Sequence, residues 1–329
     1  MLKIFDARTG SSGSGGSGGA WQGLDAWNPV EANSALLDLV AAEPVVVEPV
    51  QSAAVAHRPP AIKTIAFCGA AGGVGKTSLA INVAFELATA GFRVAVLDLD
   101  VANPNLLATL NQDAISPGLA GVKRLVGQSR FTIADLDRLL MVLNFDGVRI
   151  SVMPGLPAPA TPAERDELAS VAAELLEASV SAFDYVLIDL PAFEAAPMLS
   201  TVCLELADAS FVVCGADPIG VQRFLWLKAT LQSLGLPNEP QVLVNGVRDS
   251  VLGSNAKRQL ADTIERLAQT EVTAFVPQDQ AGFDAALRGG LPLSLAKKGS
   301  PARHAISMFV RQGLLEQRTK LDWRVARNG

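Results

Sequence analysis

One glycine-rich segment of the sequence carries the residue types that bind phosphate. It reads Gly69-Ala-Ala-Gly-Gly-Val-Gly-Lys-Thr-Ser78. Glycines let backbone N–H groups curl around phosphate oxygens, and the N-terminus of a following helix attracts the same anion. In such a loop Lys76 would reach the β- and γ-phosphates, and the Thr77 hydroxyl would coordinate Mg²⁺. The residues expected to bind the nucleotide here are Gly72, Gly73, Val74, Gly75, Lys76, Thr77 and Ser78.

The sequence around this loop supplies the strand and the helix that it needs. An apolar run over residues 62–68 ends at Gly69, and a helical pattern follows over 76–90. The strict GxxxxGK[ST] template has glycine at position 70, where this chain has Ala70. A methyl group is a small steric demand, so we expect the loop to form.

The chain continues as alternating strand and helix patterns. Strands are expected at 93–99, 148–153, 184–190, 210–215, 241–247 and 271–275, and helices at 162–180, 219–234, 254–269 and 302–316. The strands are continuous apolar runs rather than alternating ones, which is typical of a parallel sheet covered on both faces. The predicted fold is therefore α/β, a doubly wound, mostly parallel sheet with helices on both faces.

The composition excludes several classes of protein. Of 329 residues, 49% are apolar and 18% charged, which excludes wholesale disorder, and the net charge of −6 argues against a wholly nucleic-acid-binding surface. No apolar run approaches the roughly 18 residues of a membrane span. The cysteines and histidines are too few and scattered for a disulfide framework or a zinc site. Cytoplasm is the expected compartment. The cysteines are Cys68, Cys203 and Cys214, and the histidines are His57 and His304.

Residues 1–60 differ in composition from the domain expected over 61–329. Residues 10–19 are only glycine and serine, and the stretch up to Pro60 is acidic and interrupted by prolines. We expect a low-complexity, disordered tail. Trp21 and Trp27 are unusual in such a segment, so residues 21–42 either fold back on the domain or dock a protein partner.

The glycine-rich loop and later segments together resemble the ParA/MinD superfamily of deviant Walker A ATPases, whose fold is that of P-loop NTPases. The resemblance covers residues 61–300, and its motifs occur in the family's order. They are Gly72–Thr77 (the phosphate loop), Leu97–Asp100 (the second motif), Asp184–Pro191 (Walker B), Val242–Arg248 (the purine loop) and Val276–Asp279 with residues 285–293 (the late segment).

The resemblance implies roles for individual residues, with ATP and Mg²⁺ as cofactors. Lys76 and Asp100 would be catalytic, with Asp100 orienting the attacking water. Thr77, Asp98 and Asp189 would hold the metal, although Asp98 could instead only cap the end of its strand. The purine side would be formed by Asn245, Arg248 and Pro277, with a turn-forming role as the alternative for Asn245.

Ala71 is the departure that bears most on mechanism. In the resembled family this position is a signature lysine that reaches the phosphates of the partner in a nucleotide-sandwich homodimer. Alanine carries neither charge nor donor, and loss of a phosphate-contacting cation commonly costs several kcal/mol of transition-state stabilisation. We therefore expect ATP binding to persist, hydrolysis to be slow, and dimerisation to depend less on nucleotide.

The run Asp189-Leu190-Pro191 and the segment 152–156 resemble the TadZ/CpaE branch, which places Flp/Tad-type pilus machinery. That branch has an N-terminal receiver-like domain where this chain has the low-complexity tail. The resemblance implies a spatial organiser or localisation factor in pilus or secretion-machine assembly, recruited to a cell pole or to a membrane-associated machine.

Other functions remain open. A DNA-partition ATPase would use basic helix faces on nonspecific DNA, a less favoured alternative because scattered basic residues are usually only solvated. A peripheral membrane contact through residues 314–325 is disfavoured by their small apolar area. A catalytically inactive nucleotide-binding scaffold is the non-enzyme alternative. The candidate DNA-contacting residues are Lys257, Arg258, Arg266, Arg303, His304 and Arg311.

Overall fold

The computed structural model describes residues 62–248 and 255–316. The predicted tail over 1–60, with its docking segment 21–42, therefore lies outside the described residues. Most of the C-terminal segment considered for membrane contact, residues 314–325, also lies outside the described residues.

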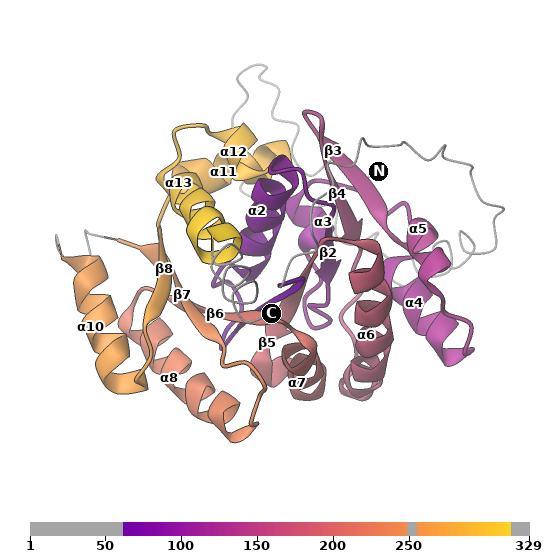
Figure 1. Ribbon diagram of the computed structural model, residues 1–329, viewed down its shortest axis with the longest axis horizontal. Coiled ribbons are helices and arrows are strands. Elements are labelled where there is room, and N and C mark those ends of the chain that lie inside the picture. The colour runs from indigo at the N-terminus through magenta and orange to yellow at the C-terminus, as the bar shows by residue number, and fades with distance from the viewer. Residues whose placement is uncertain (1–61, 249–254, 317–329) are drawn as a thin grey trace, which may run out of the picture.

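A single eight-stranded sheet organises the described chain, in the order β3-β4-β2-β5-β1-β6-β7-β8 (Figure 1). All neighbouring strands are parallel except β3 and β4. The strands are β1 (Thr64–Gly69), β2 (Val94–Asp98), β3 (Met141–Phe145), β4 (Val148–Met153), β5 (Tyr185–Ala192), β6 (Ala209–Gly215), β7 (Gln241–Val247) and β8 (Val272–Pro277).

Helices connect these strands and cover both faces of the sheet. The α-helices are α2 (Lys76–Thr89), α3 (Leu106–Thr109), α4 (Gly118–Gly127), α5 (Leu136–Leu139), α6 (Pro162–Ala182), α7 (Pro197–Leu206), α8 (Pro218–Ser233), α10 (Ala256–Ala268), α11 (Gln280–Gly289), α12 (Leu293–Ala296) and α13 (Pro301–Met308). Short 3₁₀ turns are η2 (Ile133–Asp135) and η3 (Phe193–Ala195), and α13 continues into the π-helical η4 (Phe309–Leu315).

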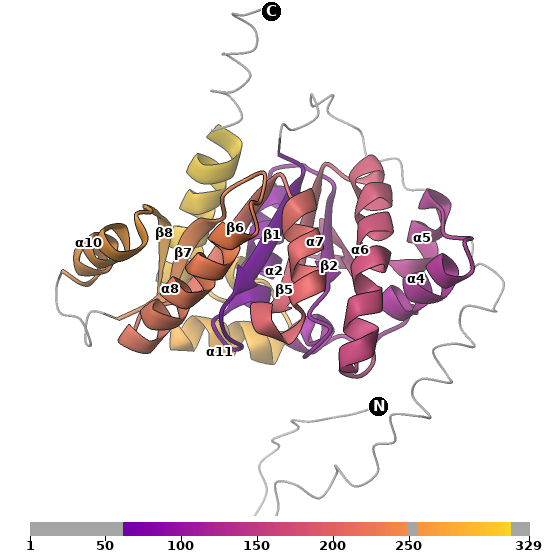
Figure 2. The same cartoon turned by 90° about the horizontal axis from the view of Figure 1, so that it is seen from below.

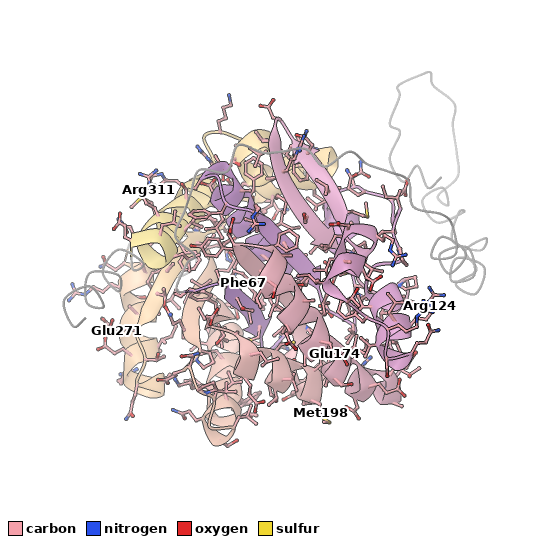
Figure 3. All side chains as sticks on the ribbon, turned by 45° about the vertical axis from the view of Figure 1, so that its right-hand side comes forward. Phe67, Arg124, Glu174, Met198, Glu271 and Arg311 are labelled. Atoms are coloured by element: carbon pink, nitrogen blue, oxygen red, sulfur yellow. The ribbon has the colours of Figure 1, made fainter. Side chains whose placement is uncertain are left out.

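Helices lie on both faces of the sheet (Figures 1 and 2), and an apolar core fills the space beneath them on each face. One packs beneath α4, α6, α7, α8 and α10, and the other beneath α2, α11, α13 and η4. The central strands β1 and β2 are buried at every position, which is why they read as continuous apolar runs. Phe67 of β1 lies inside the molecule, while Glu174 and Arg311 lie at the surface (Figure 3).

The doubly wound, mostly parallel sheet predicted from the sequence is confirmed. The expected strands and helices all occur, with ends that shift by a few residues. The strand β3, which pairs antiparallel with β4, was not expected, and neither were the ten-residue helices α4, α7 and α11. Asp146 and Gly147 join the two strands with φ angles of 52° and 87°, as a type I′ hairpin turn requires.

The order of the strands creates a switch point next to β1. Its neighbours are β5 and β6, so that α2 must carry the chain across β5 to reach β2. Ligands of open α/β sheets bind at such a point, outside the carboxyl ends of the strands. The loop after β1 and the ends of β2 and β5 therefore share the edge of the sheet where a site is expected.

Candidate phosphate-binding site

The loop between β1 and α2 has the backbone conformation of an anion cradle. Gly73 and Gly75 have φ angles of 75° and 98°, in the left-handed region that L side chains rarely adopt. Nothing lies within 4 Å of where a Cβ on Gly72 or Gly73 would stand, so this side of the loop is open. The helix that follows, α2, has 14 residues, and its first N–H groups have no intrahelical acceptor. These N–H groups and the open loop can receive an anion.

Asn245 holds this loop from a neighbouring part of the sheet. Its side-chain Nδ2 donates a 2.8 Å hydrogen bond to the backbone oxygen of Val74. A Cβ on Gly75 would overlap the same Asn245 amide. The side chain therefore ties the end of β7 to the loop, although the sequence suggested only a purine contact or a turn for this residue.

Lys76 lies at the start of α2 and is buried, with 5% of its surface exposed. Its Nζ is 3.5 Å from the backbone oxygen of Ala71, so the side chain folds back across the loop. A buried ammonium group with so weak a partner is well placed to accept a phosphate oxygen as its counterion. Burial raises the pKa of Asp100 and of Asp189, and the positive charge of Lys76 opposes this rise.

Three aspartates meet at the ends of β2 and β5. Asp98 and Asp189 are paired in register on these neighbouring parallel strands, and Asp100 follows Asp98 by two residues. All three side chains are buried. Asp98 accepts hydrogen bonds from the N–H groups of Asp100 at 3.2 Å and of Leu106 at 3.1 Å. Strand-end capping, the alternative considered for Asp98, is thus part of what this side chain does.

Burial dominates the electrostatics of this group. Desolvation raises the pKa of Asp98 well above its usual value, and the charges of Asp189 and Asp100 raise it further. Desolvation raises the pKa of Asp189 to about 7, against the lowering effects of the Thr77 hydroxyl and Lys76. So much buried negative charge is unfavourable without a cation.

Asp189 gives the clearest indication of a cation-binding site. It is fully buried, and neither carboxylate oxygen has a partner with regular hydrogen-bond geometry among the described residues. The Thr77 hydroxyl lies close enough to lower its pKa. Hydroxyl and carboxylate oxygens are the ligands that Mg²⁺ uses in nucleotide sites. The residues present therefore fit the metal that the sequence predicts.

Asp100 stands next to this group and is supported by residues that the sequence did not single out. Its Oδ1 accepts a 2.9 Å hydrogen bond from the N–H of Asn103. Arg165 of α6 donates to the backbone oxygens of Ala160 at 3.0 Å and Ala195 at 2.8 Å. Burial raises the pKa of Asp100, and the charge of Arg165 is one of the effects that oppose this rise. No local motif marks Arg165, because its partners come from two other loops.

The residues expected on the purine side lie at the ends of β7 and β8. Asn245 is in register with Val276, and Pro277, the last residue of β8, is in register with Val247. Arg248 directly follows β7 and is exposed. They share the edge of the sheet with the phosphate loop, and Asn245 also donates a hydrogen bond to that loop.

A hollow of about 300 Å³ lies between the phosphate loop and the start of α8. Ala70, Ala71 and Val74 line it from the loop, while Ile219 and Arg223 line it from α8. Ala70 and Ala71 both have negative φ, and Ala70 packs on the apolar core, so alanine at these positions is compatible with the loop.

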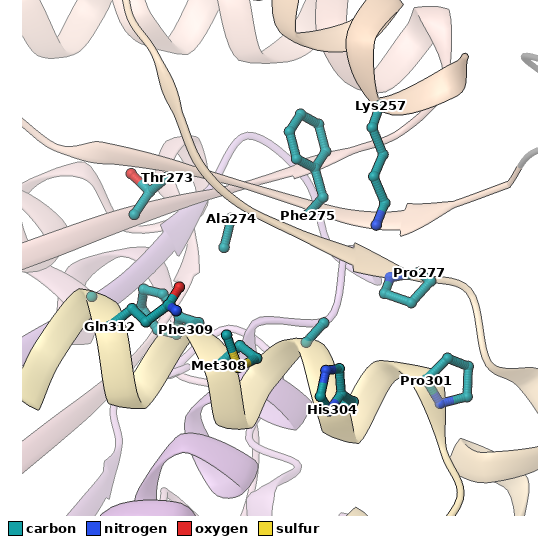
Figure 4. A pocket seen from close by; sticks show the side chains of 12 residues that line it. Lys257, Thr273, Ala274, Phe275, Pro277, Pro301, His304, Met308, Phe309 and Gln312 are labelled. Carbon is teal, nitrogen blue, oxygen red and sulfur yellow. The ribbon is translucent and has the colours of Figure 1, made fainter. Parts of the chain in front are cut away.

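A second hollow, of about 410 Å³, lies away from the loop against the edge strand β8 (Figure 4). Lys257 of α10 and His304 of α13 border it, over an apolar floor that includes Phe275 and Met308. It brings together two of the residues considered for DNA contact.

The cysteines do not form a site. Cys68, Cys203 and Cys214 are all buried and free. Burial raises the pKa of each thiol to about 12, which keeps all three protonated near neutral pH. Within the described residues no helix is long and apolar enough to cross a membrane.

Comparison with known proteins agrees with this geometry. An iron-sulfur cluster carrier protein of Deinococcus radiodurans is 28% identical over 296 residues, covering 86% of this chain and 78% of that protein. A ParA family ATPase from Chlorobium tepidum shares the fold with a TM-score of 0.62 at 20% identity, covering 76% of this chain and 97% of the other. A MinD from Pyrococcus horikoshii, complexed with Mg-ADP, does so with a TM-score of 0.57 at 18% identity, covering 76% and 95%.

The family model that matches this chain spans the loop, the three aspartates and both strands on the purine side. It is the CobQ/CobB/MinD/ParA nucleotide binding domain, matched over residues 65–293. The match contains every residue of the site described above. With its loop, strand order and buried carboxylates in this arrangement, the chain belongs to the CobQ/CobB/MinD/ParA nucleotide-binding family.

Proposed function

We propose that this protein binds Mg-ATP at the loop after β1 and hydrolyses it slowly to ADP and phosphate. The observation that carries the proposal is Asp189, a fully buried carboxylate beside Thr77 whose oxygens lack regular hydrogen bonds within the described chain. Thr77 and Asp189 would hold a divalent cation, which would offset the buried charge. The MinD of Pyrococcus horikoshii, a structural neighbour, is complexed with Mg-ADP.

Each residue of the site has a task in this proposal. The loop N–H groups and Lys76 bind the phosphates, and Asn245 holds the loop in shape. Asp98 supports the metal-binding end of β2, while Asp100 accepts a proton from, or orients, the attacking water. When bound, Mg²⁺ would neutralise phosphate charge. Arg248 and Pro277 border the purine.

Slow turnover follows from the missing charge at position 71. Ala71 contributes a backbone oxygen to Lys76 but no positive charge of its own. The phosphate chain therefore meets fewer cations than in a loop with lysine at this position, and less charge is stabilised in the transition state. Binding depends mainly on backbone N–H groups and Lys76, so it persists.

At the level of the cell, we propose a homodimeric spatial organiser that positions a Flp/Tad-type pilus or secretion machine. The run Asp189-Leu190-Pro191 and the atypical loop support this branch of the family. The partner contact is assigned to the N-terminal segment with Trp21 and Trp27, and the site of action to a cell pole or a membrane-associated machine.

DNA binding is the second candidate, because Lys257 and His304 border the same hollow at the edge of the sheet. Retention on nonspecific DNA that falls steeply with salt would favour it over the organiser. Carrying an iron-sulfur cluster, as the name of the Deinococcus relative describes that protein, would require cysteine ligands, and all three cysteines here are buried.

The decisive experiment measures Mg-ATP binding, turnover and solution mass on one sample in each nucleotide state. We expect binding that Lys76→Ala abolishes, slow release of phosphate, and a slower rate than in Ala71→Lys. Binding with no turnover in either form would identify a scaffold instead. A protein that fails to bind Mg-ATP would refute the proposed function.

A further inference from the structure

The strand β8 forms one edge of the sheet, and within the described residues it pairs only with β7 (Figure 1). The backbone groups on its outer side therefore have no strand opposite them. A row of such N–H and C=O groups is a template for pairing with a further extended segment. Proteins commonly protect such edges with charged residues, prolines or a covering segment. No residue of β8 is charged, and its single proline, Pro277, is its last residue.

The hollow of about 410 Å³ lies along this open edge (Figure 4). Lys257 of α10 borders it on one side, and residues 301–313 of α13 and η4 border it on the other. Phe275 packs against the core beneath α10 and Ala274 against the core beneath α13, yet both line the same hollow. The hollow therefore extends around the edge of β8, with a helix as a wall on each face of the sheet. An extended chain beside β8 would lie between these two walls.

The C-terminal segment, residues 317–329, does not fit this hollow. It follows η4, and α13 with η4 runs opposite to β8, because Pro301 lies at the Pro277 end of the strand and Gln312 at the Thr273 end (Figure 4). A strand formed after η4 would therefore be parallel to β8. The segment also carries four basic residues and one acidic residue, so its net charge has the same sign as that of Lys257.

The handedness of the connection argues against the same segment. The helices α8 and α10 carry the chain outward from β6 to β7 and from β7 to β8, and both pack in one core. The helix α13 packs in the other core. A further parallel step outward across that face would have the opposite hand, whereas parallel connections almost always share one hand.

The segment that precedes β1 can reach the edge without this conflict. The strands β1, β6, β7 and β8 are parallel, so all of them start at the same end of the sheet. A chain beside β8 lies four strand spacings from β1, which is about 19 Å at roughly 4.8 Å per spacing. Residues 51–61 can span up to about 36 Å at roughly 3.3 Å per residue. A strand that ends at Val50 therefore reaches β1 easily, and the shortest path makes it antiparallel to β8.

The sequence of residues 43–50 suits the outermost position in a sheet. Val45–Val47 is the one run of consecutive β-branched residues in positions 1–61, and valine is enriched in strands. A continuous apolar run fits a strand that is covered on both faces. Pro44 and Pro49 flank the run, and proline is tolerated in edge strands because their outer N–H groups have no partner strand.

The charges of the segment and of the hollow are complementary. Residues 43–50 contain two glutamates and no basic residue. The hollow is bordered by Lys257 and His304, and no acidic side chain lines it within the described part of the chain. Lys257 lies near Pro277 (Figure 4), and it has no ion pair or hydrogen bond with a described residue. In the antiparallel direction Glu43 comes to this same end of β8.

We propose that residues 45–50 of this chain form a ninth strand, antiparallel to β8, in the hollow between α10 and α13. The added strand pairs with the open backbone edge, and its valines cover the apolar floor at Phe275 and Met308. The residues before it, including Trp21 and Trp27, then begin at this edge of the molecule. The inference goes beyond the proposed function, because the pairing requires no nucleotide.

The first test measures amide hydrogen exchange in β8 of the full chain. The triple variant Val45→Ser/Val46→Ser/Val47→Ser keeps the length and charge of the segment but removes its apolar side chains. We expect the amides of residues 272–276 to exchange at least tenfold faster than in the unaltered chain. Leu36→Ser/Leu37→Ser/Leu39→Ser is the matched control, with three apolar residues replaced outside the added strand, and it should leave β8 unchanged. Unchanged exchange in β1 would show that the domain stays folded in both variants.

The second test links the segment to β8 with a short bis-maleimide. The pair Val46→Cys and Thr273→Cys should give a link within one chain, since Thr273 is exposed and lines the hollow. The three native cysteines are buried, with thiol pKa values raised by burial to about 12, so they do not compete. The control pair is Val46→Cys and Val142→Cys, because Val142 is 65% exposed on β3 at the opposite edge of the sheet. We expect no link in that pair.

Equal exchange of β8 in the valine variant and the unaltered chain would overturn the inference. Links between two copies would assign the edge to a second copy, and protection that appears only with added nonspecific DNA would assign the hollow to DNA. Either outcome would also refute a pairing with residues 45–50. All of these measurements are made without Mg-ATP, so they fail or succeed independently of the proposed function.

Discussion

The side-chain amide of Asn245, at the end of β7, donates a hydrogen bond of 2.8 Å to the backbone oxygen of Val74 in the phosphate loop. The two residues are 171 positions apart in the chain. The bond couples the strand expected to border the purine to the loop expected to hold the phosphates. The shape of the loop therefore depends on a residue outside the glycine-rich motif.

Replacing Asn245 with alanine should weaken nucleotide binding by loosening the loop. Loss of a hydrogen bond to a partly buried carbonyl costs about 1–2 kcal/mol, which corresponds to roughly tenfold in affinity. Binding of ATP and of inorganic tripolyphosphate should fall together, because the loop serves both. Isothermal titration with each ligand measures this. A loss confined to ATP would assign Asn245 to the purine alone. Asn238→Ala, which removes a similar 3.2 Å bond to the oxygen of Ala207, is the control.

Gly75→Ala should destabilise the protein and abolish nucleotide binding. The φ angle of 98° penalises any side chain, and the new Cβ would overlap the Asn245 amide. We expect a loss of at least about 1–2 kcal/mol in the free energy of unfolding, measured by urea denaturation. Gly72→Ala is the matched substitution in the same loop, since nothing lies within 4 Å of its Cβ position. Equal stability of the two variants would contradict this account of the loop.

Asp189→Asn should remove the effect of Mg²⁺ on ATP binding. The unaltered chain should bind ATP more tightly with Mg²⁺ than with EDTA, whereas the variant should show little difference, because asparagine is a weak ligand for this cation. The variant should also resist urea at least as well as the unaltered chain in EDTA at pH 8, since a buried charge without a partner is costly. Asp113→Asn, at an exposed loop position, is the control. An undiminished Mg²⁺ effect in Asp189→Asn would exclude Asp189 as a metal-binding residue.

The start of α6 predicts a pH-dependent contribution to stability. Thr161 and Glu164 form a capping box there, and Glu164 also pairs with Lys123 at 3.1 Å. Hydrogen bonds from Thr161, then the contact with Lys123, lower the pKa of Glu164 to about 2. A lowered native pKa stabilises the fold above the unfolded value near 4.5, and this contribution is lost as the pH falls toward 2.

Glu164→Gln keeps the geometry of the capping box and removes only the charge. We expect the variant to be less stable by under about 1 kcal/mol at pH 7, because the side chain is partly exposed and solvent screens it. The difference should shrink between pH 4 and pH 3 in urea denaturation. A difference that is constant over this range would show that the charge of Glu164 does not contribute.

The elements around the site could be predicted because their signals are local. Buried parallel strands read as apolar runs, and the glycines at 73 and 75 mark backbone that only glycine adopts easily. The strand β3 was missed although Asp146-Gly147 is a recognised hairpin signal. Its alternating pattern, buried at Met141 and exposed at Val142, differs from the continuous runs of the other strands.

The amino-acid sequence by itself determined the α/β alternation, the phosphate loop and the acids at the ends of β2 and β5, since backbone preference and apolar patterning act between near neighbours. Only the tertiary structure decided that Asn245 supports the loop, that Arg165 stands near Asp100, and that Arg223 and Ala71 line the same hollow. These contacts depend on the order of the strands and on the helices that cross between them. Contacts between residues far apart in the sequence determine the strand order and the helix crossings, and no local sequence pattern encodes these contacts.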